Sequence, residues 1–185
     1  MKKGTAIHWF RQDLRLSDNP ALDSAAQYET LIPIYILDEV NSGEFKMGAA
    51  SKWWLHQSLT KLNESLDGKL LVYQGNPHEI LNKLIEEQEV SYVTWNRCYE
   101  PWRIDRDKEI KRNFEDKNVA VESFSASLLW EPWTISKDDG TPYRVFTPFY
   151  KKGCLNSEEP RLPAGKVDLS NLYSEDLSSD SITDL

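Results

Sequence analysis

The segment TAIHWFRQDLRLSDNPAL (residues 5–22) holds the pattern that decides the fold. Its first six residues are mostly apolar, as in a buried strand, and charged residues follow at once. Asn19 can then cap a helix whose first residue is Pro20. The segment therefore predicts a strand followed closely by a helix, with charged side chains at the carboxyl end of the strand.

The same alternation of strand and helix continues along the chain. Mostly apolar runs, typical of strands covered on both faces, occupy residues 5–10, 31–37, 69–74, 91–96 and 119–124. Leucines recur at helical spacing over residues 55–66, and Asn76 can cap a helix that begins at Pro77. A further helix is expected over residues 102–118. This order predicts an α/β fold with a doubly wound, Rossmann-like, five-stranded parallel sheet and helices on both of its faces.

The chain is expected to divide into two parts. Residues 1–130 form the α/β domain, and residues 131–185 form an extended connector with a short helix near residues 147–152. From Lys166 onward the sequence is acidic, rich in serine and poor in core residues, which is typical of a linker or tail.

Composition narrows the classes of function. Of the 185 residues, 39% are hydrophobic and 28% are charged, and no apolar run approaches the roughly 20 residues that cross a bilayer. The absence of a signal-peptide pattern predicts a cytoplasmic protein without a membrane partner. A net charge of −8 argues against binding of the phosphate backbone of a nucleic acid by this chain alone. Cys98 and Cys154 are expected to be free thiols, and no metal site is indicated.

Charged residues follow three of the predicted strands. The carboxyl ends of parallel strands lie at the same edge of a sheet, and ligands of such sheets bind at that edge. We therefore expect this edge to bring together Arg11, Asp13, Asp38 and Glu100. The glycines form neither GxGxxG nor a P-loop, and there is no GxSxG elbow. The three histidines are scattered, and each is expected to have a structural or a solvent-exposed role rather than a catalytic one.

Tryptophan is unusually frequent, with seven residues. Most are expected to pack in the core. Trp53 and Trp54 are neighbours on one predicted helix and point about 100° apart, so both cannot face one sheet. One of them is expected to face another segment or a missing partner.

Four motifs in order carry a resemblance to a known family. They are WFRQDLRLSDNPAL, MGAASKWWLHQSL, WNRCYEPWRIDRD and DGTPYRVFTPFYKK. From Thr5 to Cys154 the chain resembles the amino-terminal α/β domain of the DNA photolyase and cryptochrome family, and especially the bacterial cyclobutane pyrimidine dimer photolyases.

The resemblance implies a light-driven DNA repair flavoprotein, a deoxyribodipyrimidine photo-lyase. In this family the α/β domain accompanies an antenna chromophore: methenyltetrahydrofolate, a deazaflavin or a flavin. A following helical domain binds FAD and damaged DNA, and reduced FAD splits the dimer by electron transfer. This chain corresponds to a fragment that lacks the helical domain, so it is expected to carry no catalytic residue and no repair activity.

The matching motifs nominate six antenna-binding residues. Glu100 stands where pterin-binding members place a carboxylate. The others match the region where deazaflavin or flavin antennae insert: Arg11, Leu37, Asp38, Met47 and Lys52. Lys52 stands where arginine is frequent. The antenna type stays open, and Asp13 and Arg15 are expected to serve structure rather than chromophore contact.

Two other functions remain open at this point. One is a cryptochrome, a blue-light photoreceptor rather than an enzyme, and the other is a stand-alone nucleotide-binding sensor. The fragment is also expected to self-associate through apolar surface around Trp53, Trp54 and residues 146–150, which the helical domain would cover.

Overall fold

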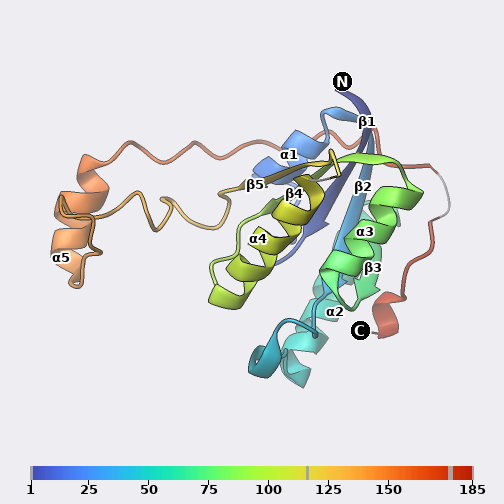
Figure 1. Cartoon of the computed structure of the whole chain (residues 1–185), viewed down its shortest axis with the longest axis horizontal. Helices are drawn as coiled ribbons and strands as arrows, with labels where there is room; N and C mark the ends of the chain where they lie inside the picture. Colours follow the sequence, from blue (N-terminus) through green and yellow to red (C-terminus); the bar gives the residue numbers. More distant parts are fainter. Residues whose placement is uncertain (1, 116, 175–176, 185) are drawn as a thin grey trace.

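The computed structural model describes residues 2–115, 117–174 and 177–184. Its centre is a five-stranded sheet in the order β3-β2-β1-β4-β5, in which every neighbouring pair is parallel (Figure 1). The strands are β1 (Lys2–Phe10), β2 (Tyr28–Leu37), β3 (Leu71–Gln74), β4 (Val90–Asn96) and β5 (Ala120–Phe124). The predicted α/β fold with five parallel strands is confirmed.

Helices cover both faces of the sheet. They are α1 (Pro20–Ala25), α2 (Ala49–Ser65), α3 (Pro77–Glu87) and α4 (Pro101–Glu115). On one face Ala6 and Phe10 of β1 share a core cluster with leucines of α1 and α2. On the other face Ile7 and Trp9 share a second cluster with α3 and α4. Successive residues of β1 therefore face opposite layers, which explains why its sequence is apolar without alternation.

The two predicted helix starts have the expected geometry. Asn19 Oδ1 accepts a hydrogen bond from the Leu22 N–H at 3.1 Å, and Asn76 Oδ1 accepts one from the His78 N–H at 3.1 Å. In both helices proline takes the first position, where its missing N–H costs nothing. The caps differ in burial, since Asn19 is fully buried and Asn76 is partly exposed.

Two strands begin three residues earlier than the apolar runs suggest. β1 starts at Lys2 and β2 at Tyr28, and these two residues are register partners. The pairing register shifts between Lys2 and Thr5, around Gly4 with a φ of 106°. Backbone pairing there does not need apolar side chains, so hydrophobicity alone could not detect it.

A long excursion follows β5 and carries a helical segment away from the sheet (Figure 1). The segment begins with α5 (Phe146–Pro148) and continues through two further turns, Phe149–Gly153 and Cys154–Asn156. It packs on itself: a Cβ at Gly153 would lie 2.7 Å from the Ile135 side chain. Only glycine fits this close approach. Cys154 and Cys98 are both buried free thiols.

The segment after Lys166 differs from the expected tail. It returns along β2, where the Leu31 N–H donates to Asn171 O at 2.9 Å and the Tyr173 N–H donates to Leu31 O at 3.0 Å. Further on, the Asp180 N–H donates to Val72 O of β3 at 2.8 Å. Val167 and Tyr173 are buried. The expectation of a tail poor in core residues is therefore wrong, because backbone groups of β2 and β3 and a few apolar side chains attach the segment to the sheet.

No helix among the described residues is long and apolar enough to cross a membrane.

We expect Asn19→Ala to destabilise the chain more than Asn76→Ala. Asn19 also accepts a hydrogen bond from Asn96 Nδ2 at 2.7 Å, so its removal leaves buried partners unsatisfied. The expected losses in unfolding free energy are about 3 kcal/mol for Asn19→Ala and about 1 kcal/mol for Asn76→Ala. Urea denaturation measures both, and equal losses would contradict this account of the buried cap.

Candidate functional site

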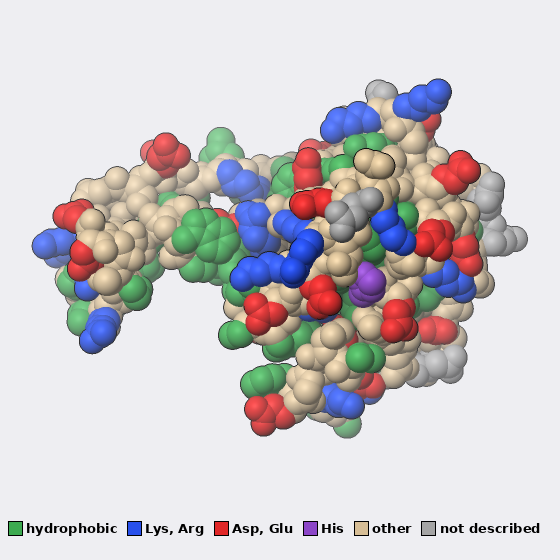
Figure 2. All heavy atoms as spheres, in the orientation of Figure 1, with side chains coloured by type: hydrophobic (Ala, Val, Ile, Leu, Met, Phe, Trp, Pro, Cys, Tyr) green, Lys and Arg blue, Asp and Glu red, His purple; other side chains and the backbone are tan. Residues whose placement is uncertain are grey.

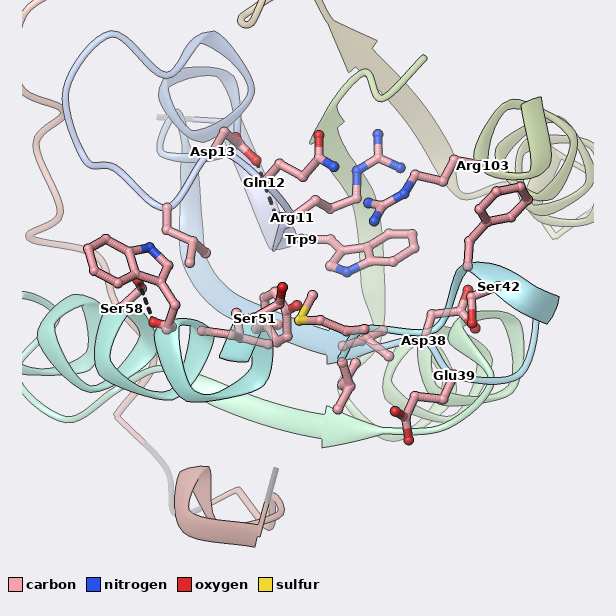
Figure 3. A pocket seen from close by; sticks show the side chains of 18 of the residues that line it. Trp9, Arg11, Gln12, Asp13, Asp38, Glu39, Ser42, Ser51, Ser58 and Arg103 are labelled. Atoms are coloured by element: carbon pink, nitrogen blue, oxygen red, sulfur yellow. Dashed lines mark hydrogen bonds between the residues drawn. The ribbon is translucent and has the colours of Figure 1, made fainter. Parts of the chain in front are cut away.

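A cavity of about 750 Å³ opens at the carboxyl ends of β1 and β2 (Figure 3). The first turns of α2 and α4 form its side walls. Its lining includes Trp9, Arg11, Gln12, Asp13, Leu37, Asp38, Glu39, Ser42, Phe45, Met47, Ser51, Trp54, Trp102, Arg103 and Arg106. It lies where ligands of open parallel sheets bind, and its volume suits a ligand of cofactor size.

Trp9 forms a buried wall of this cavity. The guanidinium groups of Arg11 and Arg106 lie 5.2 and 4.7 Å from the centre of its ring. The side chain is 1% exposed, and its Nε1–H has no hydrogen-bond partner among the described residues. A buried indole N–H normally has an acceptor. The wall of the cavity therefore contains a buried donor whose hydrogen-bonding capacity is unused.

A chain of four buried charges runs behind this wall. Asp38 of the β2 exit pairs with Arg106 of α4 at 2.9 Å, and Arg106 pairs with Asp107 at 2.8 Å. Asp107 in turn pairs with Arg11 of the β1 exit at 2.5 Å. The alternation of sign compensates each charge with a neighbour, as burial requires. It joins the ends of two strands to one helix.

Arg11 has little capacity left for a ligand. Besides Asp107, its guanidinium donates to the carbonyl oxygen of Asn96 through Nε, at 3.1 Å, and through Nη2. Its side chain is only 1% exposed. Arg11 therefore lines the cavity mainly as a fixed positive charge that holds β1, β4 and α4 together.

Asp13 and Arg15 line the cavity and also make hydrogen bonds within the protein. Asp13 accepts hydrogen bonds from the Arg11 N–H at 3.1 Å and from Asn96 Nδ2. Arg15 donates to the carbonyl oxygens of Asp18 and Ala126, at 2.8 and 2.9 Å. These bonds fix the loop between β1 and α1 against the end of β4 and the start of the excursion.

Lys52 and Glu100 lie outside the cavity lining. Lys52 pairs with Glu39 at 2.5 Å, and this hydrogen-bonded pair holds the pKa of the Glu39 carboxyl below its usual value. Glu39 itself lines the cavity, so Lys52 acts on the site through it.

Glu100 has a side chain that is 40% exposed and contacts two residues of the cavity wall. It accepts a hydrogen bond from Gln12 Nε2 at 2.8 Å and lies 3.6 Å from Arg103 Nε. Burial alone would raise the pKa of Glu100, but its own backbone N–H, the charge of Arg103 and the bond from Gln12 together lower it. Both Gln12 and Arg103 line the cavity, so Glu100 orients two of its walls.

The structure thus brings four of the six nominated residues to the cavity: Arg11, Leu37, Asp38 and Met47. Sequence reasoning missed Trp9, Arg103 and Arg106. The signal was present in WRIDRD, because residues 103 and 106 are three apart and share a helix face directly after a strand end. Trp9 could not be found, since a buried strand tryptophan normally only packs.

The histidines have structural partners. His8 is fully buried, with Nδ1 3.2 Å from Thr94 Oγ1 and Nε2 3.5 Å from the Asn19 amide. His56 donates from Nδ1 to Ile182 O, and His78 stacks on Phe114. Within the described residues no group of three His, Cys, Asp or Glu side chains could hold a metal ion.

The sheet and its cavity define an α/β domain of the doubly wound class, and comparisons with known proteins agree. A model of the DNA photolyase family matches residues 6–166. The chain is 42% identical over 168 residues to a deoxyribodipyrimidine photo-lyase of Agrobacterium fabrum, and the aligned region covers 89% of this chain and 34% of the relative. It is 35% identical over 160 residues to cryptochrome-2 of Arabidopsis thaliana, which covers 84% of this chain and 26% of that relative.

A solved structure extends the likeness to the whole fold. A bacterial class III photolyase from Agrobacterium tumefaciens superposes with a TM-score of 0.90 and 36% identity, covering 100% of this chain and 38% of that one. The chain belongs to the DNA photolyase family, as its four motifs predicted. It spans about a third of the length of the photolyases that it matches.

We expect Asp107→Asn to be strongly destabilising, because it leaves two buried guanidinium groups short of negative charge. The expected loss in unfolding free energy is about 3 kcal/mol. Asp105→Asn, on the exposed face of the same helix, should change stability by less than about 0.5 kcal/mol. Chemical denaturation of both variants provides the measurement, and a small effect at Asp107 would mean that the charge chain is not coupled.

His8 should make stability depend on acidity. Burial lowers the pKa of His8 from 6.5 to about 4 in the folded chain. Between these two values the unfolded chain binds a proton that the folded chain does not, so stability falls as the pH falls. The ring should account for about 1.4 kcal/mol per pH unit across this window. In His8→Gln the slope of unfolding free energy against pH should be shallower by about one proton; parallel curves would refute the assignment.

Proposed function

We propose that this chain is the antenna-chromophore domain of a light-driven DNA repair flavoprotein, a deoxyribodipyrimidine photo-lyase. The observation that carries the proposal is the cavity at the strand ends, with the unpartnered Trp9 donor in its wall. The 42% identity to a protein named deoxyribodipyrimidine photo-lyase favours repair as the activity of the complete protein.

The residues of the cavity suit a planar heterocycle. Leu37, Met47 and Leu55 provide apolar surface, while Trp54 and Phe45 stand exposed at the mouth. Trp9 Nε1–H is a buried donor without an acceptor beside this surface, and a ring carbonyl or ring nitrogen would meet it after a small movement of the wall. Folate, deazaflavin and flavin antennae all carry such acceptors on a planar ring, so each of the three is compatible with this cavity.

Each nominated residue then has a part in binding. Asp38 and Arg11 hold the wall rigid through the buried charge chain. Lys52 positions Glu39, and Glu100 positions Gln12 and Arg103. The bound antenna supplies light absorption and passes excitation to FAD, which we place in the helical domain. The contribution of this chain is a fixed orientation and the exclusion of water from the ring.

The remaining two thirds of the protein are proposed to supply the chemistry. Relatives are about three times as long as this chain, and the helical domain of the same polypeptide is the proposed partner. Binding of damaged DNA is assigned to that domain, because a net charge of −8 makes this chain a poor surface for phosphates.

A blue-light photoreceptor is the second candidate. The 35% identity to Arabidopsis cryptochrome-2 supports it, since that protein shares the same domain. The two candidates differ in whether the complete protein repairs DNA.

The test uses the complete protein, expressed in hosts that make folate and deazaflavin cofactors. We expect repair of thymine dimers under blue light and an antenna absorption band whose wavelength distinguishes the chromophores. Ser51→Trp, at the cavity wall, should lower antenna occupancy at least about ten-fold, because the indole takes up space needed by the ring.

Ala49→Trp is the matched control, because Ala49 is an exposed residue two positions earlier on α2 that does not line the cavity. It should keep the antenna. Absence of light-dependent repair by the complete protein with bound FAD would favour the photoreceptor. Tight binding of ATP in place of a chromophore would favour a nucleotide sensor, which the glycine pattern argues against.

We also expect the 185-residue chain to self-associate. Trp53 and Trp54 are 63% and 69% exposed, and Phe146 is 73% exposed. Apolar surface of this kind marks a contact with another protein or domain. Sedimentation velocity over a hundred-fold concentration range should detect dimers or larger species, and Trp53→Gln should reduce them; a monomer at every concentration would contradict the expectation.

A further inference from the structure

A second, smaller cavity lies beyond the carboxyl end of β4, between α4 and the excursion that follows β5. Its volume is about 200 Å³, and it shares no lining residue with the first cavity. The wall consists of Trp95, Arg97, Cys98, Tyr99, Ile104, Asp107, Lys108, Lys111, Ser123 and Trp133. A space of this size accommodates a single ring system rather than a complete cofactor.

The charges around this cavity do not cancel. Asp107 is the one carboxylate among the described residues of its wall, and it already pairs with Arg11 and Arg106 in the buried charge chain. Arg97 is satisfied by Glu131 at 2.6 Å. Once these pairs are formed, the ammonium group of Lys111 has no carboxylate partner among the described residues. It is half-buried and donates to the neutral Ser123 hydroxyl at 2.7 Å.

Among the described residues, Lys111 has no carboxylate within ion-pair distance. Burial lowers the pKa of Lys111, and the neighbouring positive charge of Arg97 lowers it further. A half-buried ammonium group in this setting gains from an anion. Figure 2 shows Lys and Arg side chains gathered over α4 on the same side of the molecule, which would favour the approach of an anion.

A second polar group of the wall is also without a partner. Trp95 is fully buried, and its Nε1–H has no hydrogen-bond acceptor among the described residues. The Lys111 ammonium lies 5.7 Å from the centre of the Trp95 ring, so the free donor and the free cation belong to one small region. An ammonium group without a carboxylate, beside a buried indole N–H without an acceptor, points to a ligand that brings an acceptor with negative charge.

The rest of the wall is apolar and aromatic. Ile104 lies on α4, and Trp133 stands 63% exposed at the outer side, with the Arg97 guanidinium 5.9 Å from its ring. Tyr99 lies beside Trp133, with ring centres 6.5 Å apart. An aromatic ring of a ligand can pack on these side chains, while acetate or phosphate could not use them.

We propose that this second cavity binds a small aromatic carboxylate, with the carboxylate toward Lys111 and Trp95 and the ring against Ile104 and Trp133. The site is distinct from the proposed antenna cavity. The proposed site gives a role to Lys111, Trp95 and Trp133, which the antenna function does not use.

The test is a titration of the 185-residue chain with benzoate, with tryptophan labelled with ¹⁵N at the indole nitrogen. We expect saturable shifts of the Trp95 and Trp133 indole N–H signals, with the Trp9 signal unmoved. Lys111→Met should weaken benzoate binding at least about ten-fold, because it removes a charge-assisted contact and keeps the aliphatic stem. Lys83→Met, on the exposed surface of α3, removes the same charge elsewhere and should leave binding unchanged.

Two further comparisons make the result decisive. Trp133→Ala changes an exposed side chain, so the chain should still fold and benzoate binding should weaken. Acetate and benzyl alcohol, which lack the ring and the charge respectively, should bind more weakly than benzoate. Absence of saturable shifts, shifts confined to Trp9, or equal affinity in Lys111→Met and the unmodified chain would overturn the proposal.

Discussion

The alternating chain of Asp38, Arg106, Asp107 and Arg11 is the interaction on which the site depends. The carboxyl ends of parallel strands lie at the same edge of the sheet, and the hydrogen bonds of the sheet do not fix the loops that follow these strands. Four buried charges of alternating sign do so here, by joining the exits of β1 and β2 to one face of α4. No member can be removed without leaving a neighbour uncompensated, so the wall is rigid.

This constraint also separates the two cavities. Asp107 lies at the boundary between them. Its carboxylate pairs with Arg11 and Arg106 beside the larger cavity, and it forms no ion pair with Lys111 in the smaller one. The same arrangement buries two indole rings, Trp9 and Trp95, edge to face at 5.7 Å, each with an unpartnered N–H. One buried donor without an acceptor therefore lies beside each cavity.

Much of the fold could be predicted because its signals are local. Apolar runs and the two capped helix starts, at Asn19 and Asn76, identified the strands and the crossovers. The attachment of the segment after Lys166 could not be predicted, since its few apolar side chains are widely spaced among acidic residues and its hydrogen bonds to β2 and β3 use backbone groups. In the site, four nominated residues line the cavity, whereas Lys52 and Glu100 act one contact away. A motif position does not reveal that difference.

The stretch of residues 5–22 by itself determined a buried strand, a charged exit and a helix capped at Asn19, because these depend on neighbours within a few positions. Only the tertiary structure decided what the charges do. Arg11 meets a carboxylate 96 positions away, and Trp9 becomes a cavity wall with an unused donor because α4 packs across the strand ends. Such partners are chosen by the packing of distant elements, which local sequence cannot encode.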